Sequence, residues 1–313
     1  MLVKNNIIEV DSNYSTTRCL SKQKPLVVKG QDNKINSILF SSTENKVMHH
    51  GGLRCSGYFK HSLPDQLLIT VVTVVYNGEM HLEQTIQSVI NQTYNNVEYI
   101  VIDGGSNDGT VDIIRQYENK IDYWVSETDG GIADAMNKGI SLSTGEYIVF
   151  IHADDYFECN NILKTVIKKV NKSDIILLDI LYGKKLTKSS PRGFNFWMNF
   201  KTGVYHQASL CRSRIFKSIG GFDTDFKVAM DYDFFLRTYR RDFTIQKLPY
   251  VLSVMRDTGI SSRRDAKSVM QRLYEERMVH EKNCSGLMMK YIYEVYWLLY
   301  TRYKKIFFTR QIN

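Results

Sequence analysis

The 313-residue sequence is poor in proline and cysteine, with four and five residues respectively. So few prolines, together with 43% hydrophobic and 12% aromatic residues, exclude a wholly disordered chain and indicate a globular protein with a sizeable core. The five cysteines are scattered and form no CxxC pair. This spacing argues against a disulfide scaffold or a zinc module and favours a reducing compartment.

Long apolar runs and targeting signals are also absent. No uncharged apolar run reaches the roughly 18 residues of a membrane-spanning helix. The first residues, Met-Leu-Val-Lys-Asn-Asn, lack the apolar core and cleavage site of a secretory signal, so we expect a cytoplasmic protein. The net charge of +8 fits nucleic acid, an anionic membrane or an anionic substrate. Nucleic acid is not expected, because no recognition helix, zinc finger or RNA-binding strand motif is present. A solvated basic surface and a membrane role both stay open.

Three regions are predicted along the chain. Residues 1–64 are rich in Ser, Asn, Lys and Thr, with brief apolar runs at 25–28 and 35–40. We expect this N-terminal extension to be poorly structured, at most a loose hairpin, and assign it no function. A central domain over 65–260 and a C-terminal helical region over 261–313 follow.

The central domain alternates β-strand and helix patterns. Residues 67–75 are almost continuously apolar and β-branched, as in a strand buried on both faces. Apolar residues at helical spacing follow at Leu82, Ile86, Val89 and Ile90. Further strands are predicted over 97–102, 123–126 and 146–151, and further helices over 111–117 and 132–140. This alternation predicts a doubly wound α/β domain, in which ligands bind beyond the carboxyl ends of the strands.

The first polar cluster follows two of these strands. Tyr76-Asn-Gly78 comes after the first strand, and Asp103-Gly-Gly-Ser-Asn-Asp-Gly-Thr110 after the second. Glycines allow close approach to a ligand, and an aspartate at a strand end can accept hydrogen bonds from a base or ribose. The residues are also a turn signature, so a purely structural turn stays open. The cluster lacks the GxGxxG pattern of dehydrogenases, which argues against hydride transfer.

The second cluster is His152-Ala-Asp154-Asp155, directly after the strand at 146–151. Adjacent carboxylates repel each other unless a cation neutralises them, and their hard oxygens suit Mg or Mn. We expect Asp155 at a solvent-facing pocket, with His152 either a third ligand or a histidine at the pocket rim. An Asx turn capping the next helix, near Asn161, is the alternative.

The third cluster is Met230-Asp-Tyr-Asp-Phe-Phe-Leu-Arg237. Phe235, Leu236 and Tyr239 form an apolar helical face, so Asp231 is predicted near the start of a helix. In isolation, an aspartate at that place is an ordinary N-cap.

Taken in order, the motifs resemble those of the family 2 glycosyltransferases. Val-Val-Thr-Val-Val-Tyr-Asn-Gly (71–78), the run at 86–94 and Val-Ile-Asp-Gly-Gly-Ser-Asn-Asp-Gly-Thr (101–110) look like the family's opening. Ser-Glu-Thr-Asp-Gly-Gly-Ile-Ala-Asp-Ala-Met-Asn-Lys-Gly-Ile (126–140) and the run ending at Asp155 continue it. The likeness covers roughly 67–240. Its DGGS and ADAMNKG versions are similar to a bacterial subgroup that builds surface polysaccharides, such as O-antigen, capsule or exopolysaccharide.

The resemblance implies a GT-A fold, a Rossmann-like mixed sheet flanked by helices. It also implies inverting transfer of one sugar from a nucleotide-sugar donor to the hydroxyl of a glycan or lipid-linked sugar. The residues matched to the family's functional positions are Asp231 as general base, Asp154 and Asp155 for Mn or Mg, Tyr76 and Asp103 for the nucleotide, Asn137 and Lys138 on the donor side, and His206 and Gln207 on the acceptor side. Asp154 would also hold the donor diphosphate through the metal.

Three positions depart from the family pattern. Gly104 replaces a second acidic residue, which leaves the base preference open, Met230 replaces a glutamate, and His152 replaces the first acid of the metal motif. The Gln-x-x-Arg-Trp signature of processive synthases is absent, which favours a one-sugar transferase. Two alternatives remain, a catalytically inactive relative that only binds, and a nucleotidyl or phospho-sugar transferase. The latter usually carries a glycine-rich phosphate loop that is not found.

The stretch at 291–310 is dense in aromatics and ends in a basic cluster. It is too charged to span a bilayer, but aromatic bodies with Lys and Arg tips suit the membrane interface. We expect it to dock peripherally on the anionic inner face of the cytoplasmic membrane, where a lipid-linked acceptor would be presented. The alternative is a helix that packs its aromatics onto the central domain.

Overall fold

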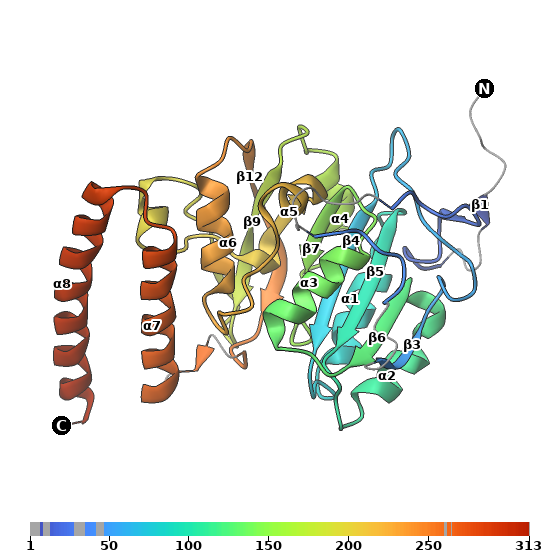
Figure 1. The fold of residues 1–313 in the computed structure, drawn as a ribbon. Coiled ribbons are helices and arrows are strands. Elements are labelled where there is room, and N and C mark those ends of the chain that lie inside the picture. The colour runs from blue at the N-terminus through green and yellow to red at the C-terminus, as the bar shows by residue number, and fades with distance from the viewer. Residues whose placement is uncertain are drawn as a thin grey trace.

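The computed structural model describes residues 7–8, 13–27, 35–41, 47–259, 262–263 and 265–312 (Figure 1). The strands are β1 (Ile7–Ile8), β2 (Leu20–Ser21), β3 (Val47–Gly51), β4 (Ile69–Val75), β5 (Val97–Asp103), β6 (Tyr123–Glu127), β7 (Tyr147–Phe150), β8 (Asp155–Phe157), β9 (Ile175–Tyr182), β10 (Thr187–Ser189), β11 (Ser209–Arg212) and β12 (Ile245–Met255). The helices are α1 (Leu82–Ile90), α2 (Thr110–Gln116), α3 (Ile132–Leu142), α4 (Ile162–Ile167), α5 (Ser213–Ile219), α6 (Met230–Tyr239), α7 (Ala266–Lys282) and α8 (Leu287–Ile312). The structure also describes the short 3-10 turns η1 (Glu118–Lys120), η2 (Phe196–Asn199) and η3 (His206–Ala208).

One large mixed sheet organises the molecule. Its strand order is β3-β6-β5-β4-β7-β11-β9-β12-β8, with β10 paired to β9. Strands β6, β5, β4 and β7 are mutually parallel, and β9 is parallel to β12. The four strands and three helices predicted over 67–151 are all present, with ends shifted by a few residues at most. The predicted α/β class with a mixed sheet flanked by helices is therefore confirmed.

Both faces of the sheet are covered, which explains the unbroken apolar runs. Every residue of β4 and of β5 is buried. Val72 packs with Met136 of α3 on one face, whereas Val71 packs with Ile86 of α1 on the other. Each such side chain, once fully buried, stabilises the fold by about 1.5–3 kcal/mol. Helices α3, α5 and α6 contribute to the first core, and α1 and α4 to the second (Figure 1).

Strand β11 is the point where the sheet changes direction. It runs antiparallel between β7 and β9, with Cys211 opposite Ile148. Its start therefore lies at the same edge as the end of β7, so η3 meets the residues that follow β7. On the far side of the sheet, β8 pairs antiparallel with β12, with Asp155 opposite Met255. Three chain segments that are distant in sequence, namely the stretch from β7 to β8, η3 and the end of β12, thus converge at one edge.

Part of the N-terminal extension is built into the domain. β3 adds an antiparallel edge strand beside β6. Just beyond it, the buried guanidinium of Arg54 forms a 2.6 Å ion pair with Glu98 of β5, and donates to the carbonyl of Leu142 at 2.9 Å. The apolar run at 35–40 and residues 25–27 form no strand, and residue 28 lies outside the described residues. This extension is thus partly anchored to the sheet.

The C-terminal region is helical, as predicted, and α7 packs against α6 (Figure 1). His280 of α7 is fully buried between these elements. Its Nδ1 accepts from the indole of Trp297 at 2.9 Å, and its Nε2 lies 2.8 Å from the hydroxyl of Tyr232 in α6. Burial and the charge of Arg240 lower the pKa of His280 to about 4. Trp297 of α8 therefore packs on α7, and Tyr293 and Tyr296 on the same helix contact Phe200 of the central domain.

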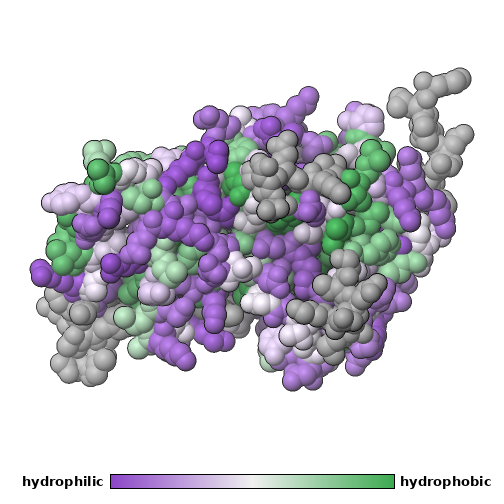
Figure 2. Space-filling view, viewed as in Figure 1, coloured by the Kyte–Doolittle hydropathy of each residue, from purple (hydrophilic) through white to green (hydrophobic). Residues whose placement is uncertain are grey.

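The other side of α8 is open to solvent. Leu298, Leu299 and Tyr303 are each more than half exposed, at 55%, 60% and 57%. Apolar side chains are visible over α8 at the left end of the molecule (Figure 2). Within the described residues, no helix combines the length and the apolar character that crossing a membrane requires. The helix is two-sided, with one aromatic face packed and one apolar face uncovered.

Candidate active site

The loops after β4 and β5 are joined to each other. Asn77, in a left-handed conformation with φ 51°, donates its N–H to the Ser106 hydroxyl at 2.7 Å, and its side-chain carbonyl accepts from the N–H of Asn107 at 3.0 Å. The N–H of Gly78 donates to the hydroxyl of Thr110 at 2.9 Å. These contacts fix the loop pair without any ligand. The cluster thus forms turns, as the structural alternative held, and these turns shape one rim of the candidate site.

Tyr76 and Asp103 occupy opposite environments in this rim. Tyr76 is 66% exposed, so its ring is available to a ligand. Asp103 is fully buried. Its carboxylate accepts from the Ser106 hydroxyl at 2.5 Å and from the Ser126 hydroxyl at 2.6 Å. Asp103 thus holds the loop that starts at Gly104 and ties it to β6.

Gly104, where the family often has a second acid, leaves room for another carboxylate. A Cβ at Gly104 would lie 2.8 Å from Oδ2 of Asp129, which follows β6. Burial raises the pKa of Asp129 above its ordinary value. The hydrogen bond that Asp129 accepts from the N–H of Gly131 at 2.8 Å acts in the opposite direction. A carboxylate from a different loop therefore lies where the family's second acidic side chain would begin.

The two adjacent aspartates after β7 are not equivalent. Asp154 is partly exposed, and its Oδ2 accepts from the hydroxyl of Thr258 at 3.1 Å. Asp155 is only 2% exposed, so the expectation that it faces solvent is wrong. The reason is that Asp155 begins β8, and successive side chains along a strand point to opposite sides. Asn161 is the N-cap of α4, so neither aspartate caps that helix.

Burial and the neighbouring charge of Asp154 raise the pKa of the Asp155 carboxyl well above its ordinary value. A hydrogen bond from Gln207 and the charge of Arg256 act in the opposite direction. The backbone of Gln207 is itself held in place, since the hydroxyl of Ser253 donates to its carbonyl at 2.8 Å. Gln207 therefore supports the acidic pair from behind.

Arg256 is a site residue that the sequence reasoning missed. Its guanidinium donates to the backbone carbonyl of Asp154 and to the side chain of Gln84, and lies 4.9 Å over the ring of Tyr156. The β8–β12 register, in which Met255 is opposite Asp155, brings it there. A strand prediction over β12 would have placed Arg256 at the same sheet edge as the other clusters.

Asp231 lies in the first turn of α6 but is not its N-cap, which is Ala229. One carboxylate oxygen accepts from the N–H of Tyr232 at 2.7 Å. The other lies 3.3 Å from Nδ1 of His206. The side chain of Asp231 is 22% exposed and that of His206 is 14% exposed. Asp231 is thus oriented toward the end of β7 and remains reachable from solvent.

His206 in turn contacts His152. Their Nε2 atoms are 2.7 Å apart, and the ring centroids are 4.9 Å apart. Burial, reinforced by His206, holds the pKa of His152 well below its ordinary value, which favours the neutral imidazole. His152 and His206 thus form a histidine pair beside the acidic pair. The structure thereby brings His152, Asp154, Asp155, His206, Gln207 and Asp231 to one edge.

Asn137 and Lys138 of α3 are engaged elsewhere. The amide of Asn137 donates to the carbonyl of Phe222 at 2.7 Å and accepts from its N–H at 2.8 Å. The ammonium of Lys138 forms a 2.5 Å ion pair with Glu127 at the end of β6. Asn137 therefore holds the turn before α6, and Lys138 braces the β6 loop near Asp129.

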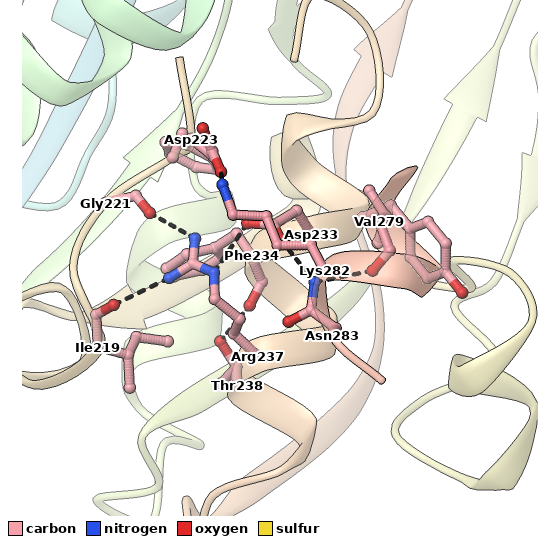
Figure 3. A network of polar contacts seen from close by, with 12 residues as sticks. Ile219, Gly221, Asp223, Asp233, Phe234, Arg237, Thr238, Val279, Lys282 and Asn283 are labelled. Atoms are coloured by element: carbon pink, nitrogen blue, oxygen red, sulfur yellow. Dashed lines mark hydrogen bonds and ion pairs between the residues drawn. The ribbon is translucent and has the colours of Figure 1, made fainter. Parts of the chain in front are cut away.

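Helix α7 fixes the segment that carries Asp231. Buried Glu275 accepts the backbone N–H groups of residues 227, 228 and 229, at 3.1, 2.7 and 2.9 Å. Figure 3 shows a second set of contacts further along α6. Asn283 donates to Asp233 at 2.8 Å, and the same carboxylate accepts from Arg237 at 2.8 Å. The C-terminal region is thus joined to α6, the helix that carries the third polar cluster.

The sequence model described as glycosyl transferase family 2 matches residues 70–246, more than half of the chain. The chain belongs to glycosyl transferase family 2. An uncharacterized glycosyltransferase of Mycobacterium tuberculosis is 32% identical over 224 residues, which cover 68% of this chain and 84% of that protein. A PGL/p-HBAD biosynthesis glycosyltransferase of Mycobacterium bovis is 27% identical over 197 residues, covering 59% and 75%. The protein is therefore similar to bacterial glycosyltransferases along most of their length.

Solved structures support the GT-A fold of this family 2 glycosyltransferase. Staphylococcus aureus TarS 1–349 in complex with UDP-GlcNAc matches with a TM-score of 0.53 at 19% identity. That match covers 68% of this chain and 65% of the TarS chain, just under two thirds. The mannosyltransferase PcManGT from Pyrobaculum calidifontis, in complex with GDP-Man and Mn2+, matches with a TM-score of 0.50 at 16% identity. At these identities the likeness shows the fold alone.

A divalent metal is the cofactor that the family resemblance implies. In the parts of the chain that the structure describes, no three His, Cys, Asp or Glu side chains gather as a metal cage. Mg is commonly bound by one or two carboxylates together with substrate phosphates, so a full protein cage is not required. Partly exposed Asp154 fits that mode. Asp155 is buried next to it, and burial together with the charge of Asp154 raises the pKa of Asp155. A cation bound at Asp154 would relieve the repulsion between the two carboxylates.

Proposed function

We propose that this family 2 glycosyltransferase transfers one sugar, with inversion, from a nucleotide-sugar donor to the hydroxyl of a glycan or lipid-linked acceptor. The supporting observation is the convergence of Asp231 and the acidic pair at one sheet edge, linked through His206 and His152. The subgroup resemblance favours surface polysaccharide as the product.

In the proposed reaction, Asp231 accepts the proton of the acceptor hydroxyl while that oxygen forms a bond to the anomeric carbon of the donor. The diphosphate departs with the electron pair of the broken bond. A Mg or Mn ion held by Asp154 would neutralise the charge on that leaving group. Arg256 holds the backbone of Asp154 in place, and Gln207 donates to Asp155 beside it.

On the donor side, the exposed ring of Tyr76 is positioned to contact the nucleotide. Buried Asp103 would act indirectly, by holding the loop that starts at Gly104. Asp129 would supply a carboxylate next to Gly104. Asn137 and Lys138 would support this side indirectly, by bracing the neighbouring turns. The base of the donor nucleotide is left to experiment.

The first experiment incubates the purified chain with a panel of UDP-, GDP- and dTDP-sugars, with and without Mn, and measures release of the nucleoside diphosphate. We expect one donor to be turned over, and excess EDTA to abolish the release. Full activity in EDTA would refute the metal proposal. Nucleotide binding without turnover of any donor or acceptor would support the inactive-relative alternative. Release of a sugar 1-phosphate instead would support a nucleotidyl transferase, and release of a nucleoside monophosphate would support a phospho-sugar transferase.

The second experiment tests the base. Asp231→Asn keeps the side-chain shape but cannot accept the proton, so we expect kcat to fall at least ~10²-fold with little change in donor affinity. Asp112→Asn is the matched control, because Asp112 is exposed on α2 with only a weak ion pair to Arg115. Near-normal kcat in Asp231→Asn would show that another group takes the proton.

We also propose that α8 docks the enzyme on the inner face of the cytoplasmic membrane. The support is its uncovered face, where Leu298, Leu299 and Tyr303 are more than half exposed near Arg302 and Lys304. Each basic residue near an anionic leaflet adds about 1 kcal/mol of attraction. In a flotation assay with anionic liposomes, we expect the Leu298→Ser, Leu299→Ser double variant to bind less than the intact chain. Equal binding by both, or no binding by either, would refute the docking role.

A further inference from the structure

Two histidines that the proposed chemistry does not use connect the metal motif to the base. His152 stands where the family has the first acid of that motif, two residues before Asp154. Its Nε2 lies 2.7 Å from Nε2 of His206, whose Nδ1 lies 3.3 Å from Oδ2 of Asp231. Three side chains, from the segment after β7, from η3 and from α6, therefore form one line of polar contacts.

The positions of the hydrogens in this line follow from what each group can donate. A carboxylate only accepts, so the hydrogen between Asp231 and His206 lies on Nδ1 of His206. In a neutral His206, Nε2 is then an acceptor, and the hydrogen in the 2.7 Å contact must come from Nε2 of His152. This leaves Nδ1 of His152 without a hydrogen. In the structure that atom is buried and meets no hydrogen-bond partner among the described residues, so no acceptor there would hold a hydrogen on Nδ1.

The same geometry fixes the plane of the Asp231 carboxylate. Its Oδ1 accepts from the N–H of Tyr232 at 2.7 Å, while Oδ2 faces His206. The backbone of α6 and the imidazole of His206 thus hold the two oxygens separately. His206 is in turn kept from rotating by its contact with His152, which follows strand β7.

We propose that His206 is a positioning residue for the base Asp231, and that His152 orients His206 instead of binding metal. This inference rests on the proposed transfer reaction. It replaces the expectation that His206 contacts the acceptor and gives a role to the departure from the acidic motif at position 152. The start of the metal motif and the base would then be aligned by one hydrogen-bonded pair.

The kinetic test is a double-mutant cycle on the full chain with the donor found in the panel. We expect His206→Ala and His152→Ala each to lower kcat about 10- to 10²-fold, the range for outer residues that orient a reacting group, with donor and Mn affinity little changed. The double variant should lose no more than the worse single variant, because both changes free the same carboxylate. In the Asp231→Asn background, His206→Ala should have no further effect.

Two controls make the cycle decisive. His49→Ala changes an exposed histidine on the edge strand β3 and should leave kcat unchanged. His206→Gln retains a donor that can reach Asp231 and should recover part of the lost kcat. Additive losses in the cycle, or a loss that appears in Mn affinity for His152→Ala, would overturn the inference. The second result would make His152 a metal ligand.

A measurement without turnover separates this inference from the proposed function. Nitrogen-15 NMR of the histidine side chains at neutral pH reports which ring nitrogen carries the hydrogen. We expect the Nδ1–H form for His206 and the Nε2–H form for His152, and a change in the His206 signals in Asp231→Asn. The opposite tautomers, or His206 signals that ignore Asp231→Asn, would overturn the contact. A chain with these tautomers but no turnover of any donor would instead defeat the proposed function.

Discussion

The buried carboxylate of Glu275 offers a sharp test of how α7 supports the site. Glu275 accepts three consecutive backbone N–H groups just before α6, two residues or more ahead of Asp231. Residue 227 is exposed and residue 228 is partly exposed, so water can replace the carboxylate there. Ala229 is buried, and its N–H would lose its partner outright.

The magnitude follows from that difference. Leaving one buried N–H unsatisfied costs about 1–3 kcal/mol, and exchanging two charge-assisted bonds for water costs less than that each. We therefore expect Glu275→Ala to lower the free energy of unfolding by about 2–4 kcal/mol. Glu275→Gln keeps an acceptor oxygen without the charge and should lose roughly half as much.

The assay is urea unfolding together with steady-state kinetics. Glu281→Ala on the same helix is the matched control, since its ion pair with Arg277 is about 60% exposed on both sides and contributes about 0.5 kcal/mol or less. Because the lost bonds loosen the start of α6, we expect kcat to fall about 10-fold in Glu275→Ala while donor KM changes little. If Glu275→Ala and Glu281→Ala unfolded at the same urea concentration, the reasoning would fail.

Three further predictions concern stability alone. Arg54→Met leaves the Glu98 carboxylate buried without its cation, so urea unfolding should show a loss of about 3–5 kcal/mol, and a loss below about 1 kcal/mol would contradict the role of this pair. Because the pKa of His280 falls from 6.5 to about 4 on folding, the unfolded chain binds more protons in this window. The stability advantage of the wild type over His280→Gln should therefore shrink by about 3 kcal/mol between pH 7 and pH 4, and a constant advantage would exclude a buried neutral imidazole. Gly139→Ala would place a Cβ 2.4 Å from a methyl group of Val72, so thermal unfolding should show a net loss of about 1–3 kcal/mol instead of the usual gain in helix propensity.

The strands and helices over residues 67–151 were predictable because each has its own pattern of apolar residues. The run at 67–75 had to be buried on both faces, and β4 is buried throughout. The polar clusters at Tyr76, Asp103 and Asp154 follow strand ends, and parallel strands place those ends at one edge. The spacing of the apolar residues and the parallel direction of the strands were sufficient to predict this part of the fold.

The contacts across the sheet could not be predicted in the same way. The pairing of His206 with His152 depends on β11 running antiparallel beside β7, a non-local register that no short pattern encodes. The position of Arg256 depends on β12, whose burial is irregular along its length. The burial of Asp155 depends on its place in the short strand β8 beside β12, and no strand was predicted there.

The joined loops after β4 and β5 have a consequence for how a ligand would be received. Ordering the backbone of one residue costs about 1–2 kcal/mol of conformational entropy at room temperature. The contacts of Asn77 and Gly78 with the β5 loop already hold this segment in place, so that ordering cost falls on folding and is not repeated at each binding event. Association on this rim would then be governed by diffusion and desolvation, and its heat-capacity change would reflect only the surface covered by the ligand.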